Sequence, residues 1–141
     1  MSFGIQREGA SVLSPRADQH DAMLMVELFK IAHAPEMLED WAWFTSEFNV
    51  KTWATLQKKY PPGSEGAMRL RRVLDFWEMV GAFVSHNVLN AGLLFDTTRD
   101  PVEVWAKVEP WVGTARKELG PGQWAFIEEL AGRAADHVNG G

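Results

Sequence analysis

The sequence predicts an all-α protein, an irregular antiparallel helical bundle of about six helices with one long helix at its centre. Three observations lead to this fold class. Every periodic run of apolar residues has the helical spacing, and no run alternates apolar and polar residues as a half-exposed strand does. Proline and glycine stand between these runs and form no long linker. The length of 141 residues is typical of one domain.

The N-terminal half predicts three helices. The first covers residues 18–33, and the second covers residues 35–48, because proline is tolerated at the first position of a helix. Asn49 is expected to cap a short third helix, which Pro61 and Pro62 end. The expected apolar stripes are Leu24, Leu28 and Ile31 in the first helix, with Met25, Phe29 and Ala32 beside them, Met37, Trp41, Phe44 and Phe48 in the second, and Trp53, Leu56 and Tyr60 in the third.

The second half predicts the central helix and two further long helices. Ser64 is a good N-cap for a helix that extends to Val88 and is apolar over most of its circumference, so it is expected to be buried on several sides. A turn at residues 90–92 precedes a short apolar piece at residues 93–95. Asp100 is expected to cap a helix that ends at residues 120–122, and a last helix covers residues 123–138. Trp77 and Trp105 lie on the clearest stripes and are predicted core residues.

Domain organisation and location follow from composition. Residues 1–17 predict a loosely ordered N-terminal arm, and residues 18–139 predict a single helical domain. The chain contains no cysteine, which excludes disulfides, thiolate nucleophiles and cysteine-ligated metal. The near-apolar windows at 23–32 and 73–84 are shorter than the roughly 20 residues of a membrane span, and the N-terminus lacks the apolar block of a secretory signal. A cytoplasmic location without membrane contact is therefore expected.

The charge is unevenly distributed. The net charge is −5, which argues against a general nucleic-acid binder because such proteins need a basic surface. Between Lys51 and Arg72, however, six basic residues accompany a single acidic one, Glu65, so this segment carries +5 and the rest of the chain −10. A solvated basic face is the expected explanation, with phosphate or acidic-partner binding as the alternative.

No catalytic or metal-binding constellation is recognisable. The four histidines lie in four separate segments, and none forms a helical pair of the kind that binds zinc or iron. No serine lies in a nucleophile motif, and no glycine-rich phosphate loop is present. Glu78 is expected to be neutralised by Arg116 or by exposure, and His86 to lie at a helix C-terminus. The sequence therefore predicts a non-enzymatic protein without a cofactor or bound metal.

From about Arg71 to Ala131 the chain carries apolar positions with recurring polar markers. The markers are Arg71, Leu74, Phe76, Trp77, Glu78 and Gly81 in the central helix, then Val88 and Leu89 before the turn, and Val104, Trp105, Trp111, Val112, Arg116, Ile127, Glu128, Glu129 and Leu130 after it. In these residues the chain resembles an uncharacterised bacterial family of small all-helical domains of unknown function. The resemblance implies an α-helical domain and supplies no activity.

Two adjacent segments of opposite charge are the candidate contact surface. The acidic side of the second helix surrounds one tryptophan, and the segment that follows is basic. The candidate residues are Trp43, Glu36, Asp40, Glu47, Lys58, Lys59, Arg69 and Arg72. Such charges either neutralise one another within one chain or meet between two copies of the chain, with Trp43 as the buried anchor.

Three functions remain open at this stage. The leading hypothesis is a non-enzymatic helical protein-interaction module, whose partner can be another protein or a second copy of the chain. The alternative is a bundle that encloses a small apolar ligand among its seven tryptophans and other rings. The third is a binder of nucleic acid or of an acidic partner through the segment from Lys51 to Arg72.

Overall fold

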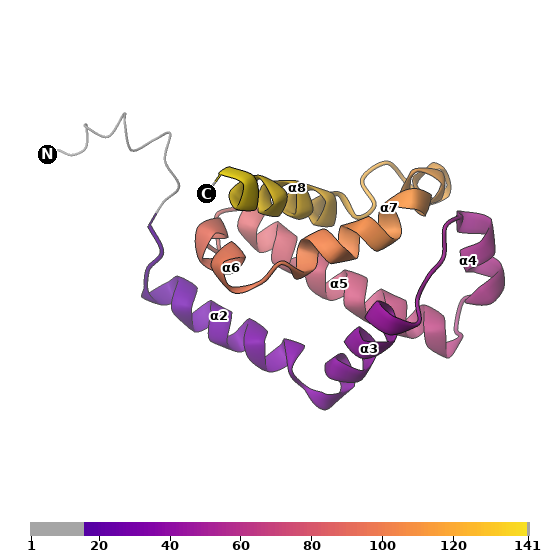
Figure 1. The fold of residues 1–141 in the computed structure, drawn as a ribbon, viewed down its shortest axis with the longest axis horizontal. Coiled ribbons are helices and arrows are strands. Elements are labelled where there is room, and N and C mark those ends of the chain that lie inside the picture. The colour runs from indigo at the N-terminus through magenta and orange to yellow at the C-terminus, as the bar shows by residue number, and fades with distance from the viewer. Residues whose placement is uncertain (1–15, 141) are drawn as a thin grey trace, which may run out of the picture.

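This computed structural model describes residues 16–140 of the chain. These residues form seven helices joined by short loops (Figure 1). They are α2 (Gln19–Ala32), α3 (Pro35–Ser46), α4 (Trp53–Lys59), α5 (Glu65–Ser85), α6 (Ala91–Thr97), α7 (Asp100–Leu119) and α8 (Ala125–Gly140). No strand occurs in these residues, which confirms the predicted all-α class. All but two residues of the predicted arm at 1–17 lie outside the described residues.

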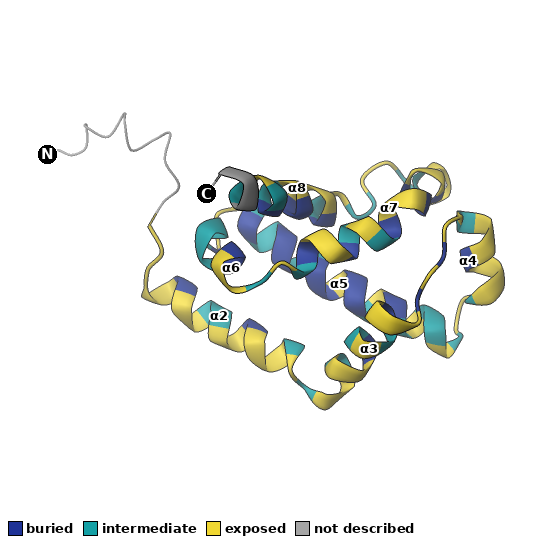
Figure 2. Cartoon of the chain, viewed as in Figure 1, coloured by how far each residue is buried: buried dark blue, intermediate teal, exposed yellow. Residues whose placement is uncertain are grey.

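The long helix α5 occupies the centre of the molecule. Helices α3 and α8 both pack against α5, and α7 packs on α8 (Figure 1). Figure 2 shows the buried residues concentrated along α5. The buried residues of α5 are Leu70, Val73, Leu74, Phe76, Trp77, Val80, Gly81 and Val84. This confirms the predicted central helix, because residues on most of its circumference are covered by neighbours.

Polar caps fix where several of the helices begin. The hydroxyl of Ser64 accepts a hydrogen bond from the N–H of Ala67 at 3.2 Å, so Ser64 caps α5 as predicted. The prediction for α4 was wrong, since the N-cap is Thr52 and not Asn49. The hydroxyl of Thr52 accepts the N–H of Thr55 at 3.1 Å and satisfies a donor that the helix leaves unpaired.

Backbone conformation accounts for two further differences from the predicted boundaries. The helix predicted for residues 64–88 ends at Ser85, because Asn87 has a left-handed φ of 59° and the next two N–H groups both return to the carbonyl of Phe83. Asn90 then caps α6, a complete helix where only a short apolar piece was expected. In the same way α8 begins at Ala125 because Trp124 has a φ of 59°.

Two other boundaries differ from the predicted ones by one or two residues. Helix α3 ends at Ser46, two residues before the predicted end. Helix α7 begins at Asp100 itself, with Arg99 as its N-cap, and continues through Pro110 to Leu119 as one helix.

The tryptophans on the two clearest stripes differ in burial. Trp77 is 7% exposed and belongs to the core, as predicted. Trp105 is only partly buried, and the guanidinium of Arg116 lies 5.8 Å from the centre of its ring. The fully buried tryptophan of α7 is Trp111, at 1% exposure. The prediction for Trp105 was wrong because the inward face of α7 is rotated toward Val104 and Trp111.

Candidate functional site

Three of the predicted contact residues meet inside the molecule. The Asp40 side chain of α3 is completely buried, and its carboxylate accepts hydrogen bonds from two arginines of α5. The Nη1 atom of Arg69 lies 3.1 Å from Oδ1, and Nη2 of Arg72 lies 2.9 Å from the same oxygen. The hydrogen bond to Asp40 raises the pKa of Arg72 above its ordinary value. In these three residues, charge neutralisation occurs within one chain.

The other predicted contact residues remain on the surface. Glu36 and Glu47 are exposed on and beside α3, and Lys58 and Lys59 are exposed in the last turn of α4. The ammonium of Lys59 lies 5.6 Å from the centre of the Tyr60 ring. The predicted basic face is therefore smaller than the sequence suggests.

Trp43 is partly buried and forms one wall of an open groove. The centre of its ring lies 5.4 Å from the centre of the Tyr60 ring, in an edge-to-face arrangement. It lies 5.5 Å from the centre of the Phe48 ring. These contacts hold Trp43 against two other rings of its own chain, and its role as the anchor of a contact between two copies stays a prediction. The groove has a volume of about 540 Å³ and lies between α3, Tyr60 and the first turns of α5; Glu39, Trp43, Glu47, Tyr60, Glu65 and Arg69 are among the residues that line it. We call it the Trp43 groove.

Gly66 allows the second wall of the groove to form. A Cβ atom at this position would overlap the ring of Tyr60, so any other residue would push the ring off the first turn of α5. The ring instead lies directly over that turn. Sequence reasoning missed this role, because the contact depends on the conformation of the turn between α4 and α5.

A second surface feature is the outer face of α2. Met23, Val26 and Phe29 are exposed by 63%, 53% and 62%, and Figure 2 shows most of the helix exposed. Only Leu28 among its large apolar residues is fully buried, whereas Ile31, predicted on the inward stripe, is 45% exposed. The reason is that α3 and the turn before α6 cover only one narrow side of α2. We call Met23, Val26 and Phe29 the α2 apolar face.

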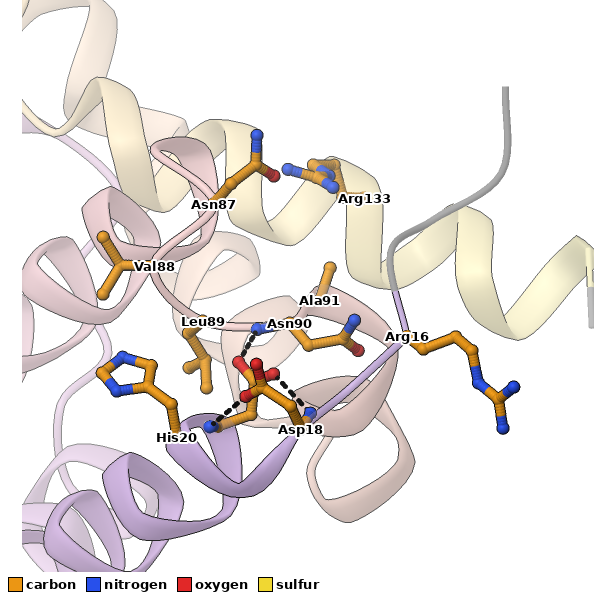
Figure 3. A pocket seen from close by; sticks show the side chains of 10 residues that line it. Arg16, Asp18, His20, Asn87, Val88, Leu89, Asn90, Ala91 and Arg133 are labelled. Atoms are coloured by element: carbon orange, nitrogen blue, oxygen red, sulfur yellow. Dashed lines mark hydrogen bonds between the residues drawn. The ribbon is translucent and has the colours of Figure 1, made fainter. Parts of the chain in front are cut away.

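A polar junction fixes the N-terminus of α2 to the rest of the fold. Asp18 and Asp21 form a reciprocal capping box, and Asp21 also accepts the N–H of Asn90 at 2.8 Å (Figure 3). The hydrogen bonds from the N–H groups of Asp18 and Asn90 lower the pKa of Asp21. The small pocket beside them, about 150 Å³, is also lined by Arg133. The carboxylates of Asp18 and Asp21 already occupy the N-terminus of α2, so we assign this pocket a structural role in attaching the helix.

Glu78 of the central helix also has a structural role. The Glu78 carboxylate accepts the N–H groups of Ile127 at 2.9 Å and Phe126 at 3.4 Å, in the first turn of α8. The predicted pairing with Arg116 was wrong, since this arginine lies 2.9 Å from Glu128. Glu78 thus satisfies orphan donors of a neighbouring helix. His86 is the C-cap residue of α5, as predicted.

Sequence reasoning also missed Lys107. Its ammonium donates hydrogen bonds to the carbonyls of Phe44 at 2.8 Å and Phe48 at 2.6 Å, so α7 caps the C-terminal end of α3. Burial lowers the pKa of Lys107, and nearby Lys51 lowers it further. No group of three or more His, Asp or Glu residues in the described part of the chain is placed to hold a metal ion.

The helical architecture and its surfaces define a small all-helical domain. Its sequence matches the family model of a domain of unknown function, DUF4760, over residues 17–134. The match covers most of the chain, and the protein therefore belongs to this family. It confirms the predicted resemblance to an uncharacterised domain family and extends it to α2. Comparisons with curated proteins and with solved structures find no match. Among the described residues, no helix has the length and apolarity needed to cross a membrane.

Proposed function

We propose that this domain is a non-enzymatic protein-interaction module and that a second copy of the chain docks on the α2 apolar face. The observation that carries the proposal is the exposure of Met23, Val26 and Phe29, each by more than half, on one helix. Clustered apolar side chains of this size are typical of interaction surfaces, whereas isolated ones are ordinary.

The spacing of the α2 apolar face supports a second copy as the occupant. Its three residues are separated by three positions each, so they lie along one side of the helix. If two α2 helices pair antiparallel around Val26, Met23 of one copy lies against Phe29 of the other, and the reverse contact forms by symmetry. Contacts between a thioether and an aromatic ring are favourable.

The size of the face sets the expected strength. A helix of 14 residues is about 21 Å long, so one face of α2 is smaller than the roughly 800 Å² per partner of a standard interface. We therefore expect a weak dimer, with a dissociation constant on the order of 100 µM.

The other two functions have less support. The Trp43 groove has aromatic walls, but carboxylates surround them, which disfavours an apolar ligand. Binding of nucleic acid through the basic segment is disfavoured because Arg69 and Arg72 bond to Asp40 and Arg71 pairs with Asp75.

Sedimentation equilibrium over a range of concentrations tests the proposal. For the wild type we expect the average mass to rise from monomer toward dimer between about 10 µM and about 1 mM. Val26→Ser combined with Phe29→Ser should remain monomeric over the same range. Met68→Ser is the matched control, because Met68 is 51% exposed on α5, away from α2, and should associate as the wild type does.

Two outcomes would contradict the proposal. One is a wild-type monomer at every concentration, and the other is a double variant that associates as strongly as Met68→Ser. Far-UV circular dichroism and thermal melting of all three proteins establish that the substitutions leave the fold intact.

A further inference from the structure

The Trp43 groove combines two aromatic walls with an excess of negative charge. We infer that it binds a protonated amine or guanidinium carried on an alkyl chain. The groove is built from α3, Tyr60 and α5, so this inference does not depend on the α2 apolar face.

The aromatic walls suit a cation. Trp43 and Tyr60 are both partly buried and meet edge to face at 5.4 Å, an arrangement that holds the two rings in place. Aromatic faces attract ammonium and guanidinium groups through the ring quadrupole. The ammonium of the neighbouring Lys59 lies 5.6 Å from the centre of the Tyr60 ring, within the distance of a cation–π contact.

The charges around the groove point to the same ligand. Glu39, Glu47 and Glu65 line it, and the cation among its lining residues is Arg69. This guanidinium is already engaged by Glu65 at 2.9 Å and by buried Asp40 at 3.1 Å. Among the described residues, Glu39 and Glu47 form no ion pair. The groove therefore presents, beside its aromatic walls, two carboxylates outside any ion pair of the described residues. The hydrogen bond to Glu65 raises the pKa of Arg69, and Glu39 is close enough to this arginine to raise its pKa further.

Other ligand classes fit less well. An anion would meet three carboxylates, and an apolar molecule would leave them poorly hydrated. A bare metal ion would make no use of the rings. An alkyl chain that ends in a cation contacts the rings with its methylene groups and the carboxylates with its charged head. The volume of about 540 Å³ lies within the range of small-molecule sites, roughly 300–1,000 Å³.

The same chemistry has two sources, a lysine or arginine side chain of a protein partner and a free diamine or polyamine. Nuclear magnetic resonance of ¹⁵N-labelled protein distinguishes them, with the indole N–H signal of Trp43 assigned from Trp43→Phe. The probes are N-acetyl-lysine methylamide, the corresponding arginine derivative and cadaverine. The neutral control is N-acetyl-norleucine methylamide, which has the alkyl chain without the charge.

We expect the cationic probes to shift the Trp43 signal in a saturable manner and the norleucine derivative to leave it unchanged. Tighter binding of the blocked amino acids indicates a protein side chain as the natural ligand, and tighter binding of cadaverine indicates a free amine. Either order supports the inference. Equal binding of the neutral probe, or no saturable shift with any cation, would overturn it.

Variants that remove the negative charge of selected glutamates locate the site. Glu39→Gln combined with Glu47→Gln should weaken the binding of cationic probes by about five- to tenfold. Glu36→Gln combined with Glu109→Gln makes the same change in net charge at exposed positions that do not line the groove, and it should bind as the wild type does. Equal affinity of the two double variants would overturn the inference, because binding would then follow overall charge.

Discussion

At the scale of single residues, Asp40 determines how α3 attaches to the central helix. Its carboxylate is completely buried, a position that is costly unless charged partners accompany it. Arg69 and Arg72 are three positions apart in α5, so both guanidinium groups project from the same face and reach the one carboxylate. The contact between α3 and α5 is thus set by charge as well as by apolar packing.

Asp40→Asn is expected to lower the free energy of unfolding by about 2–3 kcal/mol. Removing one partner of a buried ion pair costs roughly 3–5 kcal/mol, and the smaller value follows because the two guanidinium groups are 20% and 37% exposed. Asp75→Asn is the control, because Asp75 pairs with Arg71 at the surface, and it should cost no more than about 0.5 kcal/mol. Urea unfolding followed by circular dichroism measures both, and equal losses would contradict the role given to Asp40.

At the scale of helices, a glycine sets the distance between α5 and α8. A Cβ atom on Gly81 would lie 2.5 Å from the backbone carbonyl oxygen of Phe126. Backbone cannot move aside as a flexible side chain does, so the two helices would have to separate. Glu78, one turn earlier, caps the first turn of α8. Together these residues seat the N-terminus of α8 on α5.

Gly81→Ala is therefore expected to destabilise the protein by about 1–3 kcal/mol, the usual cost of overpacking a core. Gly113→Ala should have the opposite effect. Gly113 is exposed inside α7 and a Cβ atom there meets nothing within 4 Å, so alanine should add about 0.5–1 kcal/mol through helix propensity. Thermal melting of the two variants is the measurement. A Gly81→Ala protein as stable as the wild type would show that α8 does not approach α5 this closely.

Local signals in the sequence predicted most of the elements, and tertiary contacts account for the differences. Helical spacing and the Ser64 cap identified the central helix, because both act within a few residues. The bonds made by Glu78 and Lys107 join groups 49 and 63 positions apart, and no local pattern encodes them. The choice between Trp105 and Trp111 depends on the rotation of α7 about its own axis, which its neighbours fix.

The candidate surfaces were predicted less completely than the helices. Charge patterning placed opposite charges in adjacent segments and allowed neutralisation within the chain, which occurs at Asp40. The α2 apolar face was not predicted, because the apolar residues of an isolated helix do not reveal which of them a neighbour will cover. The aromatic walls of the Trp43 groove were missed for the same reason, since Tyr60 meets Trp43 only when the turn after α4 places its ring over Gly66.

At the scale of the whole molecule, two different forces can join two copies of the chain. The α2 apolar face would associate by burial of apolar area, which added salt does not weaken. A dimer that places the acidic side of α3 against Lys58 and Lys59 of a second copy would instead depend on exposed charges. Because Asp40, Arg69 and Arg72 are engaged within the chain, fewer charges remain for such a contact, and we expect the apolar face to dominate.

The salt dependence of self-association separates these two forces. Raising sodium chloride from about 0.1 M to about 1 M shortens the Debye length from about 10 Å to about 3 Å and screens exposed ion pairs. We expect the dissociation constant of the wild-type dimer, measured by sedimentation equilibrium, to stay constant or fall over this range. Lys58→Gln combined with Lys59→Gln should associate as the wild type does at both salt concentrations. A dimer that dissociates at high salt and is lost in this lysine variant would place the interface on α3 and α4, because only an interface built on exposed charge responds to both changes.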